Sequence, residues 1–285
     1  MRTVRPIVVL AAAAMAIAAS PAPAQEFGVY TRVLNLNRPA VRTAKATEPS
    51  SNVLGRSLSL FHAGKVYDTI YDAGEVTIFE PARRRFIVLN GPKRLTTEVS
   101  FDEITRSLEH AVKETRLYVA ELREQGDRTS AVPLLAQLEP GFQARYDKAT
   151  RRLILTGRYI RYHVRCAADN AGSSDPARFD RARDRYLDYA DWTARLNYLL
   201  HPNSLYPAPR LALDSQLRQR RLLPVQVDLM SATSPGMHLR AEHQYHWTLT
   251  TRDRDDIQHW ESLLAGKRLR RVKFAEYRKR VVGSR

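Results

Sequence analysis

The sequence of 285 residues has a single cysteine, Cys166, and none of the common short catalytic motifs. One cysteine excludes an intrachain disulfide framework and a zinc site built on several cysteines. The chain contains no P-loop, no Rossmann glycine fingerprint, no H-E-x-x-H motif and no G-x-S-x-G motif. These absences disfavour P-loop and Rossmann nucleotide-binding proteins, zinc proteases of the H-E-x-x-H type and α/β-hydrolases.

The first 25 residues have the pattern of a secretory signal peptide. Arg2 and Arg5 precede the apolar run Ile7–Ala19, which is too short for a bilayer core that takes about 20 apolar residues. An Ala-Pro-Ala site ends at Ala24 and predicts cleavage before Gln25. A retained membrane anchor is the alternative. We therefore expect residues 1–24 to be a signal peptide and residues 25–285 to form a single exported domain, periplasmic or secreted, with no transmembrane segment.

Positive charge is concentrated near the C-terminus. The formal charge is +16, and loss of the two arginines of the signal segment lowers it to +14. Residues 267–285 hold nine Lys or Arg and one Glu, which is more than half of this excess. Clustered cations attract anionic polymers and lipid head groups, whereas export disfavours nucleic acid as a partner. The candidate residues for contact with an anionic envelope polymer or lipid head groups are Lys267, Arg268, Arg270, Arg271, Lys273, Arg278, Lys279 and Arg280. The alternative is a strand with a solvated face followed by a basic tail.

Alternation of apolar and polar residues predicts a sheet of antiparallel strands. Extended runs over 27–36, 56–62, 65–72, 75–80 and 85–90 are separated by turns rich in glycine or proline. Strict alternation from Met237 to Thr250 predicts a strand of 14 residues. At about 3.3 Å per residue such a strand is too long to lie flat on a small core, so we expect a strongly curved sheet.

Capping residues and helical periodicity predict helices between the strands. Ser100 begins a capping box before a helix over 101–124, and Asp175-Pro176 begins a helix that ends near Leu200. Shorter helices are expected over 130–138, 211–220 and 253–264. The fold class that these patterns predict is α+β, with a large curved antiparallel sheet, an incomplete barrel, that wraps helices.

The positions of histidine, aspartate and cysteine predict neither a metal site nor a cofactor. His243 and His246 point to opposite faces of a strand, and His238 lies roughly 26 Å from His246 on its own face. Asp253 opens a helix, where an acidic side chain complements the helix dipole. Cys166 ends an alternating strand on its apolar side, and we expect it to be a buried core residue.

The segment 65–90 carries a recognisable local pattern. It runs from a strand into Glu80-Pro81, a turn, the basic residues Arg83-Arg84-Arg85 and a further strand. This pattern resembles the central strands of the periplasmic lipoprotein-carrier (LolA-like) superfamily, in which an exported curved antiparallel sheet wraps one or more helices. The resemblance implies the same architecture. The chain departs from it by its long helix over 176–200 and by lacking an early helix, so no ligand-contacting residue is transferred.

Binding is the expected activity, because no catalytic motif is present. The helix over 176–200 carries an aromatic stripe that should pack in the hollow of the sheet, and a loose fit there would leave an apolar pocket. The candidate pocket residues are Tyr186, Trp192, Tyr245 and Trp247. We expect a non-enzymatic exported protein that binds an apolar ligand or lipoprotein or contacts the envelope. The alternative is an exported hydrolase whose His and carboxylate residues are brought together only by the fold.

Overall fold

The computed structural model describes residues 26–37, 52–168, 175–201, 204–232 and 237–282. The predicted signal peptide, with its cleavage site at Ala24 and Gln25, lies outside the described residues. Within them, no helix has both the length and the apolar character needed to cross a bilayer.

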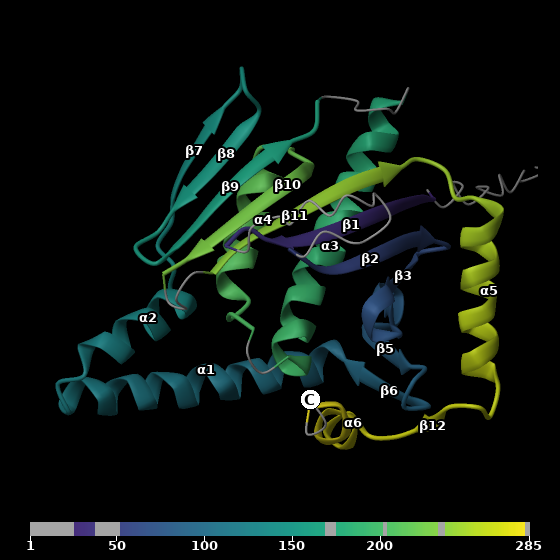
Figure 1. Cartoon of the computed structure of the whole chain (residues 1–285), viewed down its shortest axis with the longest axis horizontal. Coiled ribbons are helices and arrows are strands. Elements are labelled where there is room, and N and C mark those ends of the chain that lie inside the picture. Colours follow the sequence, from purple (N-terminus) through teal and green to yellow (C-terminus); the bar gives the residue numbers. More distant parts are fainter. Residues whose placement is uncertain (1–25, 38–51, 169–174, 202–203, 233–236, 283–285) are drawn as a thin grey trace, which may run out of the picture.

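The described strands form a single curved sheet that does not close into a barrel (Figure 1). The strand order across the sheet is β12-β6-β5-β4-β3-β2-β1-β11-β10-β9-β8-β7. Every pair is antiparallel except β12 with β6. The strands are β1 (Phe27–Asn35), β2 (Val53–His62), β3 (Lys65–Ile70), β4 (Glu75–Glu80), β5 (Arg85–Asn90), β6 (Leu95–Ser100), β7 (Gln143–Asp147), β8 (Arg152–Thr156), β9 (Ile160–Cys166), β10 (Pro224–Ser231), β11 (Met237–His246) and β12 (Arg270–Arg271).

Six helices lie among the described residues, and the predicted α+β class with a curved sheet is confirmed. They are α1 (Phe101–Glu124), α2 (Arg128–Leu138), α3 (Pro176–Leu200), α4 (Ala208–Gln219), α5 (Thr251–Ala265) and α6 (Phe274–Val282). The predicted bounds of α1 and α3 are confirmed. The side chains of Ser100 and Asp175 accept hydrogen bonds from the first-turn N–H groups of Glu103 and Ala177.

The core lies on both faces of the central strands. On the inner face, α3 lies in the hollow of the sheet (Figure 1), where Tyr189 packs edge-on against Phe61 with ring centroids 5.9 Å apart. On the outer face, Trp260 of α5 stacks on Tyr67 at 6.1 Å. Strands β2 to β5 are therefore covered on both sides, which explains the continuous apolar run Phe86–Leu89 of β5.

Tight turns join the strands of this meander. Gly74, between β3 and β4, has a φ of +58°, and an added Cβ would lie 2.9 Å from the ring of Pro92. Glycine is required there both by the left-handed backbone and by the lack of space. These hairpins fix the register that brings the inner-face side chains together.

Two predicted elements differ in the structure. The strand that begins at Met237 ends at His246, because Thr250 caps α5 in a reciprocal capping box with Asp253. The alternative prediction of a C-terminal strand with a solvated face and a basic tail holds only for the exposed two-residue strand β12 and is wrong for residues 274–282, which form the helix α6. Phe274 and Tyr277 fix this helix because both side chains are buried.

Cys166 occupies the core position that strand parity predicts. It is buried at the end of β9, and burial raises the pKa of its thiol to about 12. A thiol with such a pKa carries almost no thiolate at neutral pH, so Cys166 is a packing residue and a poor nucleophile.

Candidate functional site

The inner face of the sheet changes from apolar to polar over two residues. Strand register places Phe27, Phe61, Val66, Phe79, Phe86 and Val99 in one continuous row across β1 to β6. The next inner-face row, two residues along each strand, is Val29, Ser59, Asp68, Thr77, Val88 and Thr97. An aromatic core therefore gives way to hydroxyl and carboxyl groups beneath α3.

A cavity of about 390 Å³, which we call the polar cleft, lies where these polar residues face α3 and α4. Its size is at the small end of the range for ligand sites. Its lining residues are Thr31, Val33, Gly55, Arg56, Ser57, Ser59, Asp68, Ile70, Tyr186, Tyr189, Ala190, Thr193, Ala194, Asn197 and Arg210. Three strands and two helices thus contribute to one site.

Asp68 is the buried carboxyl group of the polar cleft. The Ser59 hydroxyl donates a hydrogen bond of 2.5 Å to its Oδ1, and the Tyr189 hydroxyl is within reach of the same group. Burial raises the pKa of Asp68 to about 6, against the opposing effect of these hydrogen bonds. The protonated and ionised forms of Asp68 therefore coexist near pH 6, and the ionised form, which only accepts hydrogen bonds, predominates above it.

Arg210 of α4 is one of two cations that line the polar cleft, the other being Arg56 of β2. The Arg210 Nε donates to both carboxylate oxygens of Asp214, at 3.0 and 2.9 Å. Burial alone would lower the pKa of Arg210, but the Asp214 carboxylate outweighs it and holds the pKa above its ordinary value. The Asp214 side chain is 0% exposed, whereas 24% of the Arg210 side chain is exposed. Its buried Nη2 donates to no described acceptor. The pair places a charge-balanced guanidinium at the wall of the cleft.

His243 of β11 lies beside the polar cleft as a neutral side chain. Its Nδ1 shares a hydrogen bond of 2.9 Å with the Thr31 hydroxyl, and its Nε2 lies 3.4 Å from the Tyr186 hydroxyl. Burial, with the positive charge of Arg210 as a second cause, lowers the pKa of His243 to about 3. Across the described residues, no group of three or more His, Cys, Asp or Glu side chains is close enough to hold a metal ion.

No protein-family model matches this chain, and no curated protein matches it in sequence.

The four aromatic residues predicted to line an apolar pocket have different positions. Tyr186 lines the polar cleft. Trp192 stacks on Phe101 with ring centroids 3.7 Å apart, and Trp247 lies 6.2 Å from Tyr245 in the core. Only Tyr186 of the four borders the cleft, so the hollow of the sheet holds a polar cavity beside a packed aromatic core.

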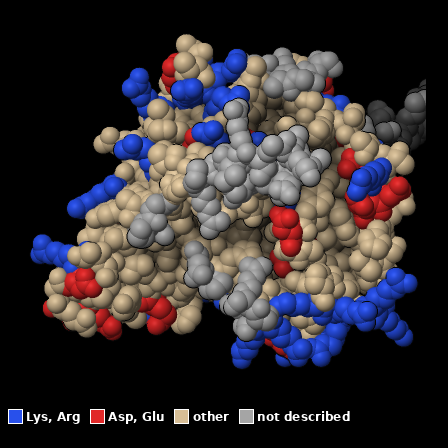
Figure 2. All heavy atoms as spheres, in the orientation of Figure 1, with Lys and Arg blue, Asp and Glu red and all other residues tan. Residues whose placement is uncertain are grey.

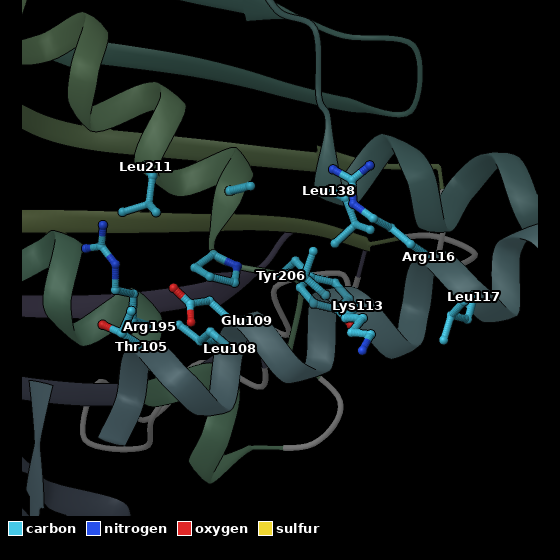
Figure 3. A pocket seen from close by; sticks show the side chains of 13 residues that line it. Thr105, Leu108, Glu109, Lys113, Arg116, Leu117, Leu138, Arg195, Tyr206 and Leu211 are labelled. Atoms are coloured by element: carbon cyan, nitrogen blue, oxygen red, sulfur yellow. The ribbon is translucent and has the colours of Figure 1, made fainter. Parts of the chain in front are cut away.

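A second cavity, which we call the outer groove, lies between α1 and the start of α4. It has a volume of about 660 Å³ (Figure 3). Its lining residues are Thr105, Leu108, Glu109, Val112, Lys113, Arg116, Leu117, Leu138, Arg195, Tyr206, Pro207, Ala208 and Leu211. The walls are mainly apolar with charges at the rim. Leu117 and its neighbour Tyr118 are each 52% exposed, so apolar surface continues beyond the groove.

All eight predicted anion-contacting residues are exposed in the structure. They lie on the segment 267–280, which contains β12 and most of α6 and packs against β6. Figure 2 shows Lys and Arg side chains gathered along the corresponding lower edge of the molecule.

Sequence reasoning missed Ser59, Asp68 and Arg210 of the polar cleft. By strand parity, one face of β2 carries Ser57, Ser59 and Phe61. The change from hydroxyl to aromatic side chains along this face is the sequence signal that could have indicated a polar site. The sequence does not show that Arg210 of α4 faces the same cavity.

Proposed function

We propose that this protein is an exported binding protein that holds a small neutral polar ligand in the polar cleft. The observation that carries the proposal is the convergence of buried hydroxyl, carboxyl and guanidinium groups on one cavity. Buried polar groups cost free energy unless they are paired, so their concentration around an opening favours a binding role.

The charge balance of the cleft favours a neutral ligand. The charge of Arg210 is offset by Asp214, and the charge of Arg56, the other cation of the lining, is offset by Asp68 to the extent that this carboxyl, with a pKa of about 6, is ionised. The hydroxyl groups of Thr31, Ser57 and the two tyrosines offer both donors and acceptors. A molecule with several hydroxyl or amide groups, such as a sugar or polyol, matches this set.

The proposal predicts that loss of one cleft hydroxyl weakens ligand binding about tenfold. Thr193→Val removes a hydroxyl from the α3 wall while keeping the shape of the side chain. A lost hydrogen bond of about 1.4 kcal/mol corresponds to this factor. Isothermal titration with a panel of neutral sugars, polyols and organic acids measures it. Thr69→Val, on β3 but outside the cleft lining, is the matched control. Equal affinities for both variants, or binding of organic acids alone, would contradict the proposal.

The low pKa of His243 favours a binding function over hydrolysis. A histidine whose pKa is about 3 is a weak base at neutral pH. Its second ring nitrogen faces the Tyr186 hydroxyl, where a catalytic triad would hold a carboxylate. Two His–carboxylate contacts occur among the described residues, and neither lies in the cleft. His62 lies 2.6 Å from Glu26 in a part-exposed network with Arg254, and His110 lies 4.0 Å from Glu114 on the exposed surface of α1.

The outer groove supports a second candidate function, the carriage of an apolar ligand. Its apolar walls and the exposed Leu117 favour this role. Val112→Asp would place a charge in the groove and is expected to weaken binding of a fluorescent fatty-acid analogue at least tenfold. Ala120→Asp, an exposed position of α1 outside the lining, is the control. If both variants bind the analogue as the unmodified protein does, the groove is not its site.

A further inference from the structure

The C-terminal cations are held on ordered structure. β12 pairs in parallel with β6, and its backbone is fixed by Arg270 N donating to Arg94 O and Val272 N donating to Thr96 O, both at 2.9 Å. These bonds join the segment to the turn between β5 and β6. Cations from two distant parts of the sequence therefore share one edge of the sheet.

The helix α6 is anchored through its apolar side. Phe274, Tyr277 and Val281 recur at helical spacing and are buried. The Tyr277 hydroxyl donates a buried hydrogen bond of 2.8 Å to the Glu75 carboxylate of β4. The basic side chains of α6 are left on the opposite, exposed side of the helix.

These elements create a surface dominated by positive charge, which we call the basic face. It consists of Lys93, Arg94, Lys267, Arg268, Arg270, Arg271, Lys273, Arg278, Lys279 and Arg280, all exposed. The Lys93 ammonium donates to the Arg280 carbonyl oxygen at 2.8 Å, which places the β5–β6 turn beside α6. The segment has one acid, Glu276, which pairs with Arg270 and Arg280. The blue band along the lower edge in Figure 2 is this surface.

We propose that the basic face docks the protein on an anionic lipid bilayer. The partner is a head-group surface because the aromatic rings of this segment, Phe274 and Tyr277, are buried beneath the cations. Sites for single-stranded nucleic acid expose rings for stacking among the cations, and this face offers none from its own segment. An extended array of exposed cations suits a plane of anionic head groups. This inference does not depend on the ligand of the polar cleft.

The test is co-sedimentation of the chain from Gln25 onwards with vesicles. Vesicles of phosphatidylglycerol and phosphatidylcholine are compared with phosphatidylcholine alone, and heparin is the soluble polyanion. The triple variant Lys267→Gln, Arg268→Gln and Arg271→Gln is expected to bind anionic vesicles on the order of 100-fold more weakly, at about fivefold per cation. The unmodified protein is expected to release from them at high salt.

A matched variant separates local contact from overall charge. Arg145→Gln, Arg152→Gln and Arg161→Gln remove the same charge from exposed positions on β7 to β9, at the opposite end of the sheet from β12. Its vesicle affinity is expected to stay within threefold of the unmodified protein. An equal loss in both triple variants would overturn the proposal. So would binding to heparin without binding to vesicles, or no vesicle binding at all.

Discussion

Replacing Asp214 with leucine is expected to lower the free energy of unfolding by about 3–5 kcal/mol, because it leaves the partly buried Arg210 without its counter-charge. Both carboxylate oxygens of Asp214 accept from the Arg210 Nε, and the Asp214 side chain is fully buried. The uncompensated guanidinium would then lie among Tyr186, Tyr162 and the neutral His243. Urea unfolding followed by circular dichroism at pH 7 measures the loss.

The double variant Arg210→Met, Asp214→Leu tests the cause of that loss. Removing both charges replaces the pair by apolar groups, which is often nearly neutral, so the double variant is expected to recover at least half of the lost stability. Asp188→Ala provides a surface comparison. Asp188 pairs with Arg218 while 69% of its side chain is exposed, and its loss is expected to cost less than about 1 kcal/mol. A cost below about 1 kcal/mol for Asp214→Leu would show that the pair does not hold Arg210 in place.

Local sequence signals predicted the long helices because their ends are set by nearby residues. The cap of α1 is Ser100, and α3 is bounded by Asp175-Pro176 and His201. Each of these capping signals acts within a few residues, so it can be recognised in the sequence without knowledge of the tertiary structure. The C-terminal segment shows the limit of this reasoning. Val272 and Phe274 fit a period of two, whereas Phe274 and Tyr277 fit a helix. Burial against β6 and β4 decides for the helix.

The polar cleft was beyond sequence reasoning for a different reason. Parity predicts which residues of one strand share a face, but strand neighbours are set by long-range pairing. β1 pairs with β11, which places Thr31 beside His243 more than 200 residues away. Arg210 then reaches the same region from α4, through contacts of α3 with α4. A binding site assembled from such distant segments has no motif to find.

Asp68→Asn is expected to stabilise the protein by about 3 kcal/mol at pH 8 and to have little effect at pH 4. The pKa of Asp68 is about 6 in the folded chain and 3.8 as an ordinary aspartate, so the folded state binds the proton more tightly. The contribution of Asp68 to stability is therefore greatest below pH 4 and is lost as the pH rises through 6. A shift of about two pKa units corresponds to about 3 kcal/mol. The asparagine remains uncharged throughout and can still accept from Ser59.

The difference in the free energy of unfolding between Asp68→Asn and the unmodified protein separates the effect of Asp68 from the effects of other carboxylates. Glu80 and Asp228 form ion pairs that hold their pKa values below the ordinary range, so acid weakens both proteins equally through these groups. Guanidinium unfolding at several pH values provides the free energies. Asp72→Asn, on the exposed turn after β3, is expected to change them by less than about 0.5 kcal/mol. Parallel pH curves for Asp68→Asn and the unmodified protein would contradict the assignment. A stabilised variant that binds the cleft ligand more weakly would show that Asp68 is kept for binding at the expense of stability.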